Sequence, residues 1–202
     1  MDKEDPIYIT LHKYTKALSV ALGYRDSLTQ LHSARVLGIS EEIGTGCGLS
    51  SNELSILRIS ASFHDVGKIG ISDPILLKST KFDEAEWERM KQHSEIGERI
   101  MAATELKGSQ QASLVIRHHH EYYNGKGYPD GLSGEDISIC SRIISIADSY
   151  DAMAVTRSYH DAKTHKQIMA ILHRETGGKH DPELMRIFSK LIEHSKFKTA
   201  KI

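Results

Sequence analysis

Residues 118–130 have the sequence HHHEYYNGKGYPD, in which three consecutive histidines lead directly into a glycine-rich segment. Glycine lets the backbone approach a bound group closely, and tyrosine offers both a stacking face and a hydroxyl. Two adjacent histidines, His119 and His120, can bind one metal ion if the helix that carries them frays at its end. We expect residues 122–136 to form a structured loop rather than a helix or a strand.

A second polar stretch, HDVGK, occupies residues 64–68 at the end of an apolar run. An imidazole and a carboxylate are both good ligands for iron, manganese or zinc, and a helix that ends here would let His64 and Asp65 converge. Gly67 frees the backbone just after them. Lys68 places a cation beside them, which suits a phosphate substrate. An adjacent His-Asp pair alone is more often structural.

Three more residues have the chemistry of metal ligands but little local context. They are His32, His93 and Asp148. A carboxylate on an apolar helix stretch such as residues 143–148 is costly to bury unless it is paired or bound to a metal. Taken singly, Asp148 is explained as well by a salt bridge or a cap, and the two histidines by ordinary helix surfaces.

Helical periodicity dominates the chain, and no strand pattern extends beyond short ambiguous pieces. Ser50 and Glu53 have capping-box spacing at the start of one helix, and a short helix begins at Asp73-Pro74. The other expected helices span residues 7–22, 27–43, 51–65, 83–93, 94–103, 110–120, 138–156, 164–175 and 182–194. The predicted fold class is therefore all-α, a helical array with one glycine-rich loop.

The composition is that of an ordinary globular protein of 202 residues with a formal net charge of −1. This balance gives no basic surface for duplex nucleic acid, although a small anionic ligand needs only a local cation. Cys47 and Cys140 show neither metal-ligand spacing nor a disulfide framework. We find no secretory signal and no apolar run long enough to cross a membrane, and we expect a cytoplasmic protein.

Together, HDVGK and HHEYYNGKGYP resemble the HD-GYP family, a branch of the HD phosphohydrolases. The resemblance extends over residues 24–188, and the spacing back from the Gly-Tyr-Pro segment selects His119 and His120 rather than His118. Other segments match in the same order: His32-Ser-Ala-Arg35-Val, Lys91-Gln-His93 with Gly97, Arg142 to Asp148, Asp151-Ala-Met, and Arg157 with Tyr159.

This resemblance implies a helical HD domain over residues 26–195, with a helical extension at residues 1–25 and a tail at residues 196–202. It further implies two divalent metal ions, iron or manganese, bridged by Asp65 and a hydroxide. The implied ligands are His32, His64 and Asp148 for one metal and His93, His119 and His120 for the other. Members of the family hydrolyse cyclic dinucleotides, chiefly cyclic di-GMP, so we expect a cyclic dinucleotide phosphodiesterase.

In this interpretation Asp65 and Lys68 are the catalytic residues, and Lys68, Tyr128 and Arg157 contact the substrate. Lys68 offsets charge that develops on the phosphate, and Arg157 can form a fork of hydrogen bonds to a phosphate or a guanine edge. Glu121 is expected to orient a histidine from behind. The loop also resembles a surface that contacts diguanylate cyclase domains, which makes such a domain a candidate partner.

Two positions depart from the family pattern. Some members hold a third metal through a glutamate, which here is Leu28, so we expect two metals and a linear dinucleotide as the product. His160 stands where a lysine or arginine is frequent, which could shift preference from cyclic di-GMP toward cyclic GMP-AMP. We expect His118 to lie on a neighbouring helix face, outside the metal site, and we expect His165, His173, His180 and His194 to lie in the tail helices and face solvent.

Two other functions remain as alternatives. One is an HD-type hydrolase that acts on a different nucleotide or phosphate ester, and the other is a cyclic dinucleotide-binding or scaffold module with weak catalysis. The intact set of ligands argues against the scaffold. The sequence leaves open which metal is bound, which cyclic dinucleotide is preferred, whether the product is cleaved further to mononucleotides, and what the oligomeric state is. It is also compatible with the chain being the catalytic part of a longer sensor protein.

Overall fold

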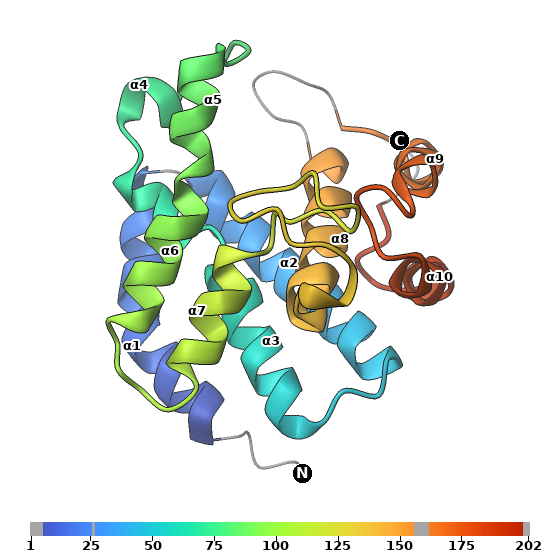
Figure 1. The fold of residues 1–202 in the computed structure, drawn as a ribbon, viewed down its shortest axis with the longest axis horizontal. Helices are drawn as coiled ribbons and strands as arrows, with labels where there is room; N and C mark the ends of the chain where they lie inside the picture. The colour runs from blue at the N-terminus through green and yellow to red at the C-terminus, as the bar shows by residue number, and fades with distance from the viewer. Residues whose placement is uncertain (1–5, 26, 156–161, 200–202) are drawn as a thin grey trace.

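The structure is a computed structural model that describes residues 6–25, 27–155 and 162–199, and the regular elements within these ranges are helical (Figure 1). The α-helices are α1 (Pro6–Arg25), α2 (Ser27–Gly46), α3 (Ser51–Phe63), α4 (Asp73–Leu76), α5 (Glu84–Lys91), α6 (His93–Ala102), α7 (Ser109–Arg117), α8 (Ile139–Ala154), α9 (His165–Glu175) and α10 (Pro182–Leu191). Short 3-10 helices occur at η1 (Val66–Gly70), η2 (Gly134–Asp136) and η3 (Ile192–His194). The prediction of an all-α fold is confirmed.

Helix starts follow the capping chemistry of the sequence. The predicted capping box at α3 is present, with the Ser50 side chain accepting from the Glu53 backbone and Glu53 accepting from the Ser50 backbone. An equivalent box joins Asp83 and Glu86 at the start of α5. The short helix α4 starts one residue earlier than its Asp-Pro signal suggests, because Ser72 is its N-cap.

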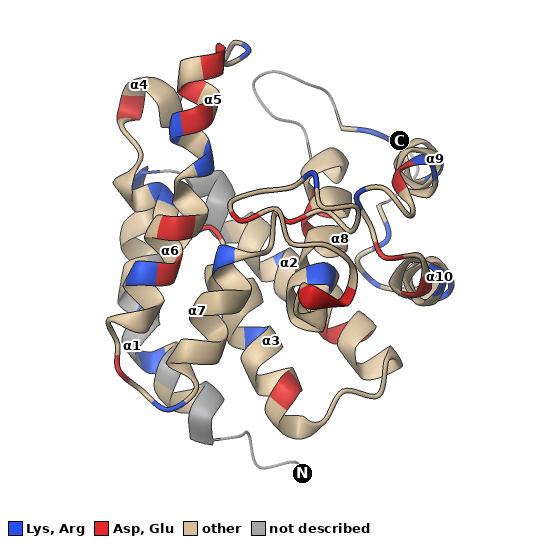
Figure 2. Cartoon of the chain, in the orientation of Figure 1, with Lys and Arg blue, Asp and Glu red and all other residues tan. Residues whose placement is uncertain are grey.

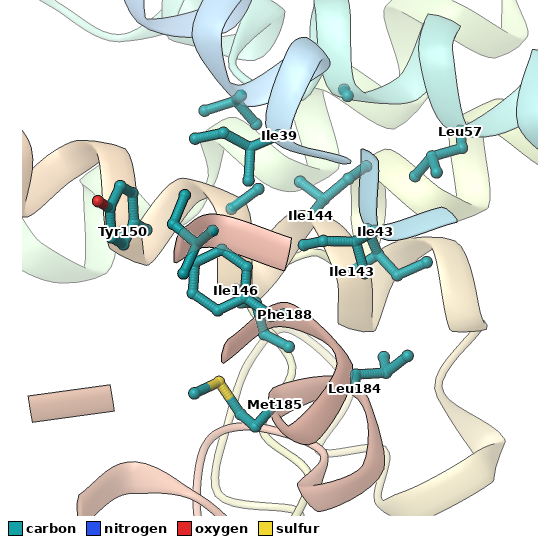
Figure 3. Packing of buried hydrophobic residues seen from close by; sticks show 14 of the residues in the cluster. Ile39, Ile43, Leu57, Ile143, Ile144, Ile146, Tyr150, Leu184, Met185 and Phe188 are labelled. Carbon is teal, nitrogen blue, oxygen red and sulfur yellow. The ribbon is translucent and has the colours of Figure 1, made fainter. Parts of the chain in front are cut away.

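The main apolar core lies where α2, α8 and α10 face one another (Figure 3). Helical spacing brings Ile39 and Ile43 of α2 onto Ile143 and Ile144 of α8, and Phe188 of α10 closes the cluster. Each side chain of this size contributes roughly 1.5–3 kcal/mol when it is fully buried. This core fixes α2 against α8, which come from distant parts of the sequence.

Helix α3 contributes to two apolar clusters and so occupies the centre of the fold. Its residues Leu57 and Ala61 belong to the core with α2 and α8. Its residues Ile59 and Phe63 belong to a second cluster that includes Met101 of α6 and Ile116 of α7. The C-terminal end of α3, just before His64, therefore lies where the two halves of the molecule meet.

The ends of the described chain pack onto the domain. Arg25, the last residue of α1, donates to the backbone of Ile71 at 2.8 Å and pairs with Asp73 at 2.5 Å. The ring of Phe197 lies against Gly38 of α2, so part of the predicted tail is docked. The division into an extension, a domain and a tail stays a prediction. Among the described residues, no helix is long and apolar enough to cross a membrane.

The glycine-rich loop after α7 is ordered by backbone contacts. Residues Tyr123 and Asn124 donate backbone hydrogen bonds to Lys179 and Gly178, and Asn124 also forms an isolated bridge with Ser133. A side chain at Gly127 would lie 2.2 Å from the Tyr122 nitrogen, so only glycine allows this approach. In Figure 1 the loop lies between α5 and α6 on one side and α8 on the other.

Candidate metal centre

Two groups of side chains converge with the spacing of metal ligands. In each group the candidate ligand atoms lie within 4.8 Å of one another. The first group consists of His32 from α2, His64 after α3 and Asp148 from α8, and the second consists of His93, His119 and His120. These six residues come from five separate parts of the chain, so only the tertiary fold brings them together. We call them the carboxylate group and the three-histidine group.

Asp65 lies between the two groups. Its Oδ1 is 3.6 Å from Nε2 of His93, and its Oδ2 is 3.5 Å from Nε2 of His64 and 3.9 Å from Nε2 of His32. One carboxylate oxygen therefore faces each group, which is the geometry that a bridging ligand needs. Lys68 donates to Oδ2 at 2.7 Å and places its cation at the same point.

Local helix ends orient three of the histidines. The Nδ1 atoms of His64, His93 and His119 lie 2.8, 2.7 and 2.6 Å from the carbonyl oxygens of Ala61, Met90 and Ile116, respectively. Each carbonyl belongs to the residue three positions earlier, at a helix end. A carbonyl accepts only from a protonated Nδ1, so each Nε2 keeps its lone pair for a ligand.

His32 is oriented by a long-range contact instead. Its Nδ1 lies 2.7 Å from Oδ2 of Asp151, and Arg35 binds the same carboxylate through Nε at 2.6 Å and Nη2 at 3.0 Å. Nε2 of His32 lies 3.0 Å from Oδ1 of Asp148. The Asp151 carboxylate thus holds the ring, and sequence analysis assigned no role to Asp151 or Arg35. Both residues lie in segments that match the HD-GYP family, and this match was the only indication in the sequence that they have a role.

The three-histidine group is neutral in the metal-free protein. Burial lowers the pKa of His93 and of His120, and burial together with the nearby His64 and His93 lowers the pKa of His119 to about 3. Neutral imidazoles are the form that binds metals, because the lone pair must be free. This group needs to lose no proton near pH 7 before it can bind a cation.

The carboxylate group holds a proton instead. Burial opposes the charged form of His32, but hydrogen bonds to Asp148 and Asp151 outweigh it and raise the pKa to about 9. Burial also opposes ionisation of Asp65 and Asp148. The charges of Lys68 and the histidines nonetheless keep the pKa of Asp65 well below its usual range, and His32 does the same for Asp148. Both carboxylates are therefore ionised near pH 7.

The donor set fits divalent cations. Nε2 of His64 is buried and makes no hydrogen bond with the residues that the structure describes, which is costly for a polar atom unless something binds it. Imidazole nitrogens with carboxylate oxygens suit iron, manganese and zinc, and they do not select one of these. The two groups and Asp65 could thus hold two such ions.

A backbone contact at Gly67 fixes how closely η1, which follows Asp65, lies against α6, which begins at His93. At Gly67 in η1, an added side chain would lie 1.8 Å from the carbonyl oxygen of His93 and 2.5 Å from the nitrogen of Gly97. No other residue fits between η1 and the first turn of α6. The glycine of the HDVGK stretch therefore does more than free the chain after the ligands, because it lets η1 touch α6.

An aromatic row leads outward from the three-histidine group. The rings of His120 and Tyr128 lie 4.9 Å apart at an interplanar angle of 32°. Beyond them, the centroid of Trp87 in α5 is 6.1 Å from that of Tyr128, and Nζ of Lys91 is 5.6 Å from the Tyr128 centroid. Sequence analysis selected Tyr128 but assigned no role to Trp87 or Lys91, which lie far from it in the sequence.

Three predicted residues lie beyond what the structure describes in full. Arg157 and His160 fall outside the described residues, so the proposed contact of Arg157 with the substrate stays a prediction. Leu28 belongs to α2, but its side chain also falls outside the described residues. The expectation of two metals rather than three therefore stays a prediction as well.

Glu121 corrects one expectation. Its Oε1 accepts from the backbone nitrogens of Asp130 and Gly131 at 2.7 and 3.0 Å, so it fixes the loop and not a histidine. His118 instead lies 2.8 Å from Asp130, away from both groups, as the spacing argument required. The expectation that the later histidines face solvent is wrong for His180, which is 1% exposed and buried beside Glu175.

Comparison with known proteins gives consistent matches. The family model described as HD domain matches residues 16–184. The chain is 38% identical to the cyclic di-GMP phosphodiesterase response regulator RpfG of Xanthomonas campestris over 82% of its own length and 44% of that protein. It is 37% identical to the 3'3'-cGAMP-specific phosphodiesterase 2 of Vibrio cholerae over 88% of its own length and 33% of that protein.

A solved structure supports the fold. Bd1817, an HDG"Y"P protein from Bdellovibrio bacteriovorus, superposes with a TM-score of 0.64 over 82% of this chain and 52% of that one, at 21% sequence identity. The chain spans less than half the length of the two relatives named above. The activity of each whole relative is therefore not assigned to this chain on the basis of the match.

Proposed function

The chain belongs to the HD domain family, as its resemblance to the HD-GYP branch predicted, and we propose that it is a metal-dependent phosphodiesterase that hydrolyses a cyclic dinucleotide. The observation that carries the proposal is the position of Asp65 between two groups of ligand atoms, with Lys68 2.7 Å from it. Both named relatives are cyclic dinucleotide phosphodiesterases and share this part of the chain.

In this proposal the carboxylate group would hold one divalent ion and the three-histidine group would hold the other, and Asp65 would contribute a carboxylate oxygen to each. Two such ions, when bound, supply an activated water near neutral pH and stabilise charge on phosphate oxygens. The carbonyls behind His64, His93 and His119 keep the rings fixed throughout. The ligand geometry is therefore formed before any substrate arrives.

Lys68 and Tyr128 act on the substrate itself. The Lys68 ammonium offsets negative charge that builds on the non-bridging phosphate oxygens, which stabilises the transition state more than the ground state. Burial raises the pKa of the Tyr128 phenol, so it stays a neutral donor and stacking surface. Arg157 is the third proposed contact.

Cyclic di-GMP is the first candidate substrate, cyclic GMP-AMP is the second, and the linear dinucleotide is the expected product. Contact of the glycine-rich loop with a diguanylate cyclase domain and a cytoplasmic location are part of the same proposal. The loop offers exposed side chains at Asn124 and Lys126 for such a contact.

The test uses purified protein loaded separately with iron, manganese or zinc. Each form is incubated with cyclic di-GMP and with cyclic GMP-AMP, and products are separated by chromatography while bound metal is counted. We expect hydrolysis to a linear dinucleotide with about two metals per chain. Hydrolysis of neither dinucleotide, with metals bound, would exclude this function, and a chain that binds no metal would support a scaffold role.

A further inference from the structure

Trp87 is an exposed aromatic side chain at the border of the proposed active site. It is 43% exposed although it contacts two other rings. Its indole lies 6.3 Å from the ring of Phe82 at an interplanar angle of 23°, and it meets Tyr128 edge to face at 82°. A single exposed aromatic residue is ordinary, but one that packs on Tyr128 beside the ligand groups is placed to contact a bound ligand.

The helix that carries Trp87 is held firmly, so the indole is positioned in advance. The capping box of Asp83 and Glu86 fixes the start of α5, and Lys78 pairs with Glu86 at 2.5 Å. Three residues after Trp87, Met90 is buried in a small cluster with Ile71 and Ile75. Residues three apart lie on adjoining parts of one helix face, so the buried Met90 anchors the face of α5 at whose edge the exposed Trp87 lies.

Trp87 and Lys91 share one face of α5, four residues apart, and both reach Tyr128. Tyr128 in turn lies against His120, a member of the three-histidine group. The row His120, Tyr128, Trp87 thus connects the metal ligands with the open surface. A substrate phosphate at the metals would place its attached nucleoside along this row.

On the basis of the proposed function, the geometry points to Trp87 as the stacking platform for one purine base of the cyclic dinucleotide. Every base has a π face, so an aromatic platform binds purines without requiring a particular hydrogen-bond pattern. Tyr128 supports the indole from its edge, and Lys91 keeps positive charge beside it. Trp87 is a binding residue in this assignment and takes no part in proton transfer.

The chain offers a direct probe, because Trp87 is its only tryptophan. Metal-loaded protein is mixed with cyclic di-GMP in a stopped-flow instrument, and tryptophan fluorescence is followed before turnover. We expect saturable quenching as the base stacks on the indole, at concentrations that match the KM. Dimethyl phosphate, a phosphodiester without a base or any other aromatic ring, is expected to leave the fluorescence unchanged.

Kinetics of two variants complete the test. Trp87→Ala should raise the KM for cyclic di-GMP by about 5- to 150-fold, which corresponds to about 1–3 kcal/mol of stacking at 1.36 kcal/mol per factor of ten. Trp87→Phe should restore most of this loss. Neither variant should change hydrolysis of methyl p-nitrophenyl phosphate, a phosphodiester without a base. Leu77→Ala, a control at a 59% exposed residue just after α4, should change neither reaction.

The outcomes separate this inference from the proposed function. Normal hydrolysis of cyclic di-GMP with no quenching, or with an unchanged KM in Trp87→Ala, overturns the stacking role alone. An equal loss with both substrates also overturns it, because it would show a structural defect. Failure of the wild-type protein to hydrolyse or bind either cyclic dinucleotide overturns both.

Discussion

The carboxylate group and the three-histidine group are built in different ways although they share Asp65. In the three-histidine group, His93 and His119 are oriented by carbonyls only three residues away, and burial keeps their rings neutral. In the carboxylate group, His32 is oriented by Asp151, which is 119 residues away, and it is protonated in the metal-free protein. His93 and His119 thus depend on local helix ends, as His64 does, whereas His32 and Asp148 of the carboxylate group depend on the packing of α2 against α8.

This difference predicts how the affinity of each group for a metal ion depends on pH. The three-histidine group is ready to bind a cation at neutral pH, because its lone pairs are free. The carboxylate group must first lose a proton from His32, but its own Asp148 and the shared Asp65 supply negative charge. We therefore expect binding at the carboxylate group to depend more steeply on pH between about 6.5 and 9. Figure 2 shows acidic and basic residues mixed along α5 and α6, so the surface charges of these two helices do not favour cations or anions as a whole.

Replacing the shared residue should have the largest effect. Asp65→Asn removes the bridging charge from both groups, and we expect hydrolysis to fall by at least about 10³-fold. Metal analysis should show loss from both groups. His118→Asn is the matched control, because this histidine contacts Asp130 and not the ligands. Retention of two metals and activity in Asp65→Asn would contradict the bridging role.

Replacing the support of one group should separate the two. Asp151→Asn leaves His32 in place but weakens the partner that orients it, and such changes reduce metal affinity by roughly 10- to 100-fold. Metal titration should show one weakened and one unchanged site. Asp136→Asn, at an exposed position in η2, serves as the control. Equal weakening at both sites would mean that the groups are not independent.

The pH dependence of the metal-free protein should differ in sign between the groups. His119 has a pKa lowered to about 3 in the folded state, so its contribution to stability is present above its unfolded pKa and is lost as pH falls toward 3. His32 has a pKa raised to about 9, so its contribution is complete below its unfolded pKa and is lost as pH rises through 9.

Thermal unfolding of chelator-treated protein tests this contrast. We expect His119→Gln to flatten the loss of Tm between pH 6.5 and 4, and His32→Gln to flatten the loss between pH 6.5 and 9. The wild-type protein should be most stable between these limits. The same pH profile in both variants would rule out the assigned protonation states.

The smallest effect is expected from the loop that follows the three-histidine group. Glu121→Gln weakens a charge-assisted hydrogen bond to the backbone of Asp130 and Gly131, at a cost of about 1 kcal/mol and about 2–4 °C in Tm. Metal content should not change, because Glu121 contacts no histidine in the described structure. Glu135→Gln, at an exposed position, is the control, and a loss of metal in Glu121→Gln would show that Glu121 does support a ligand.

Sequence reasoning succeeded where short-range chemistry decides the structure. The Ser50–Glu53 box follows from neighbouring residues, and so does the presence of the helices expected over residues 51–65 and 110–120, although these end two and three residues earlier, at Phe63 and Arg117. The ligand set itself came from a resemblance, and the structure brings those residues together. The assignment of ions to them stays a proposal.

Long-range contacts could not be predicted in the same way. Nothing near Asp151 indicates that it meets His32, and nothing near Trp87 indicates that it meets Tyr128. His180 looked like a surface residue of a polar tail, yet the packing of the segment between α9 and α10 buries it. Glu121 lies beside the ligand histidines in sequence, but the turn that follows directs its carboxylate to the loop backbone.

The contact at Gly67 has a consequence for how this centre can evolve or be engineered. At Gly67 main chain touches main chain, so at this point no side chain lies between η1 and α6 that a substitution could enlarge or shrink. The spacing between Asp65 and His93 is therefore set by the thickness of the polypeptide itself. Changes in the surrounding apolar clusters should destabilise the protein well before they alter the distance between its two ligand groups.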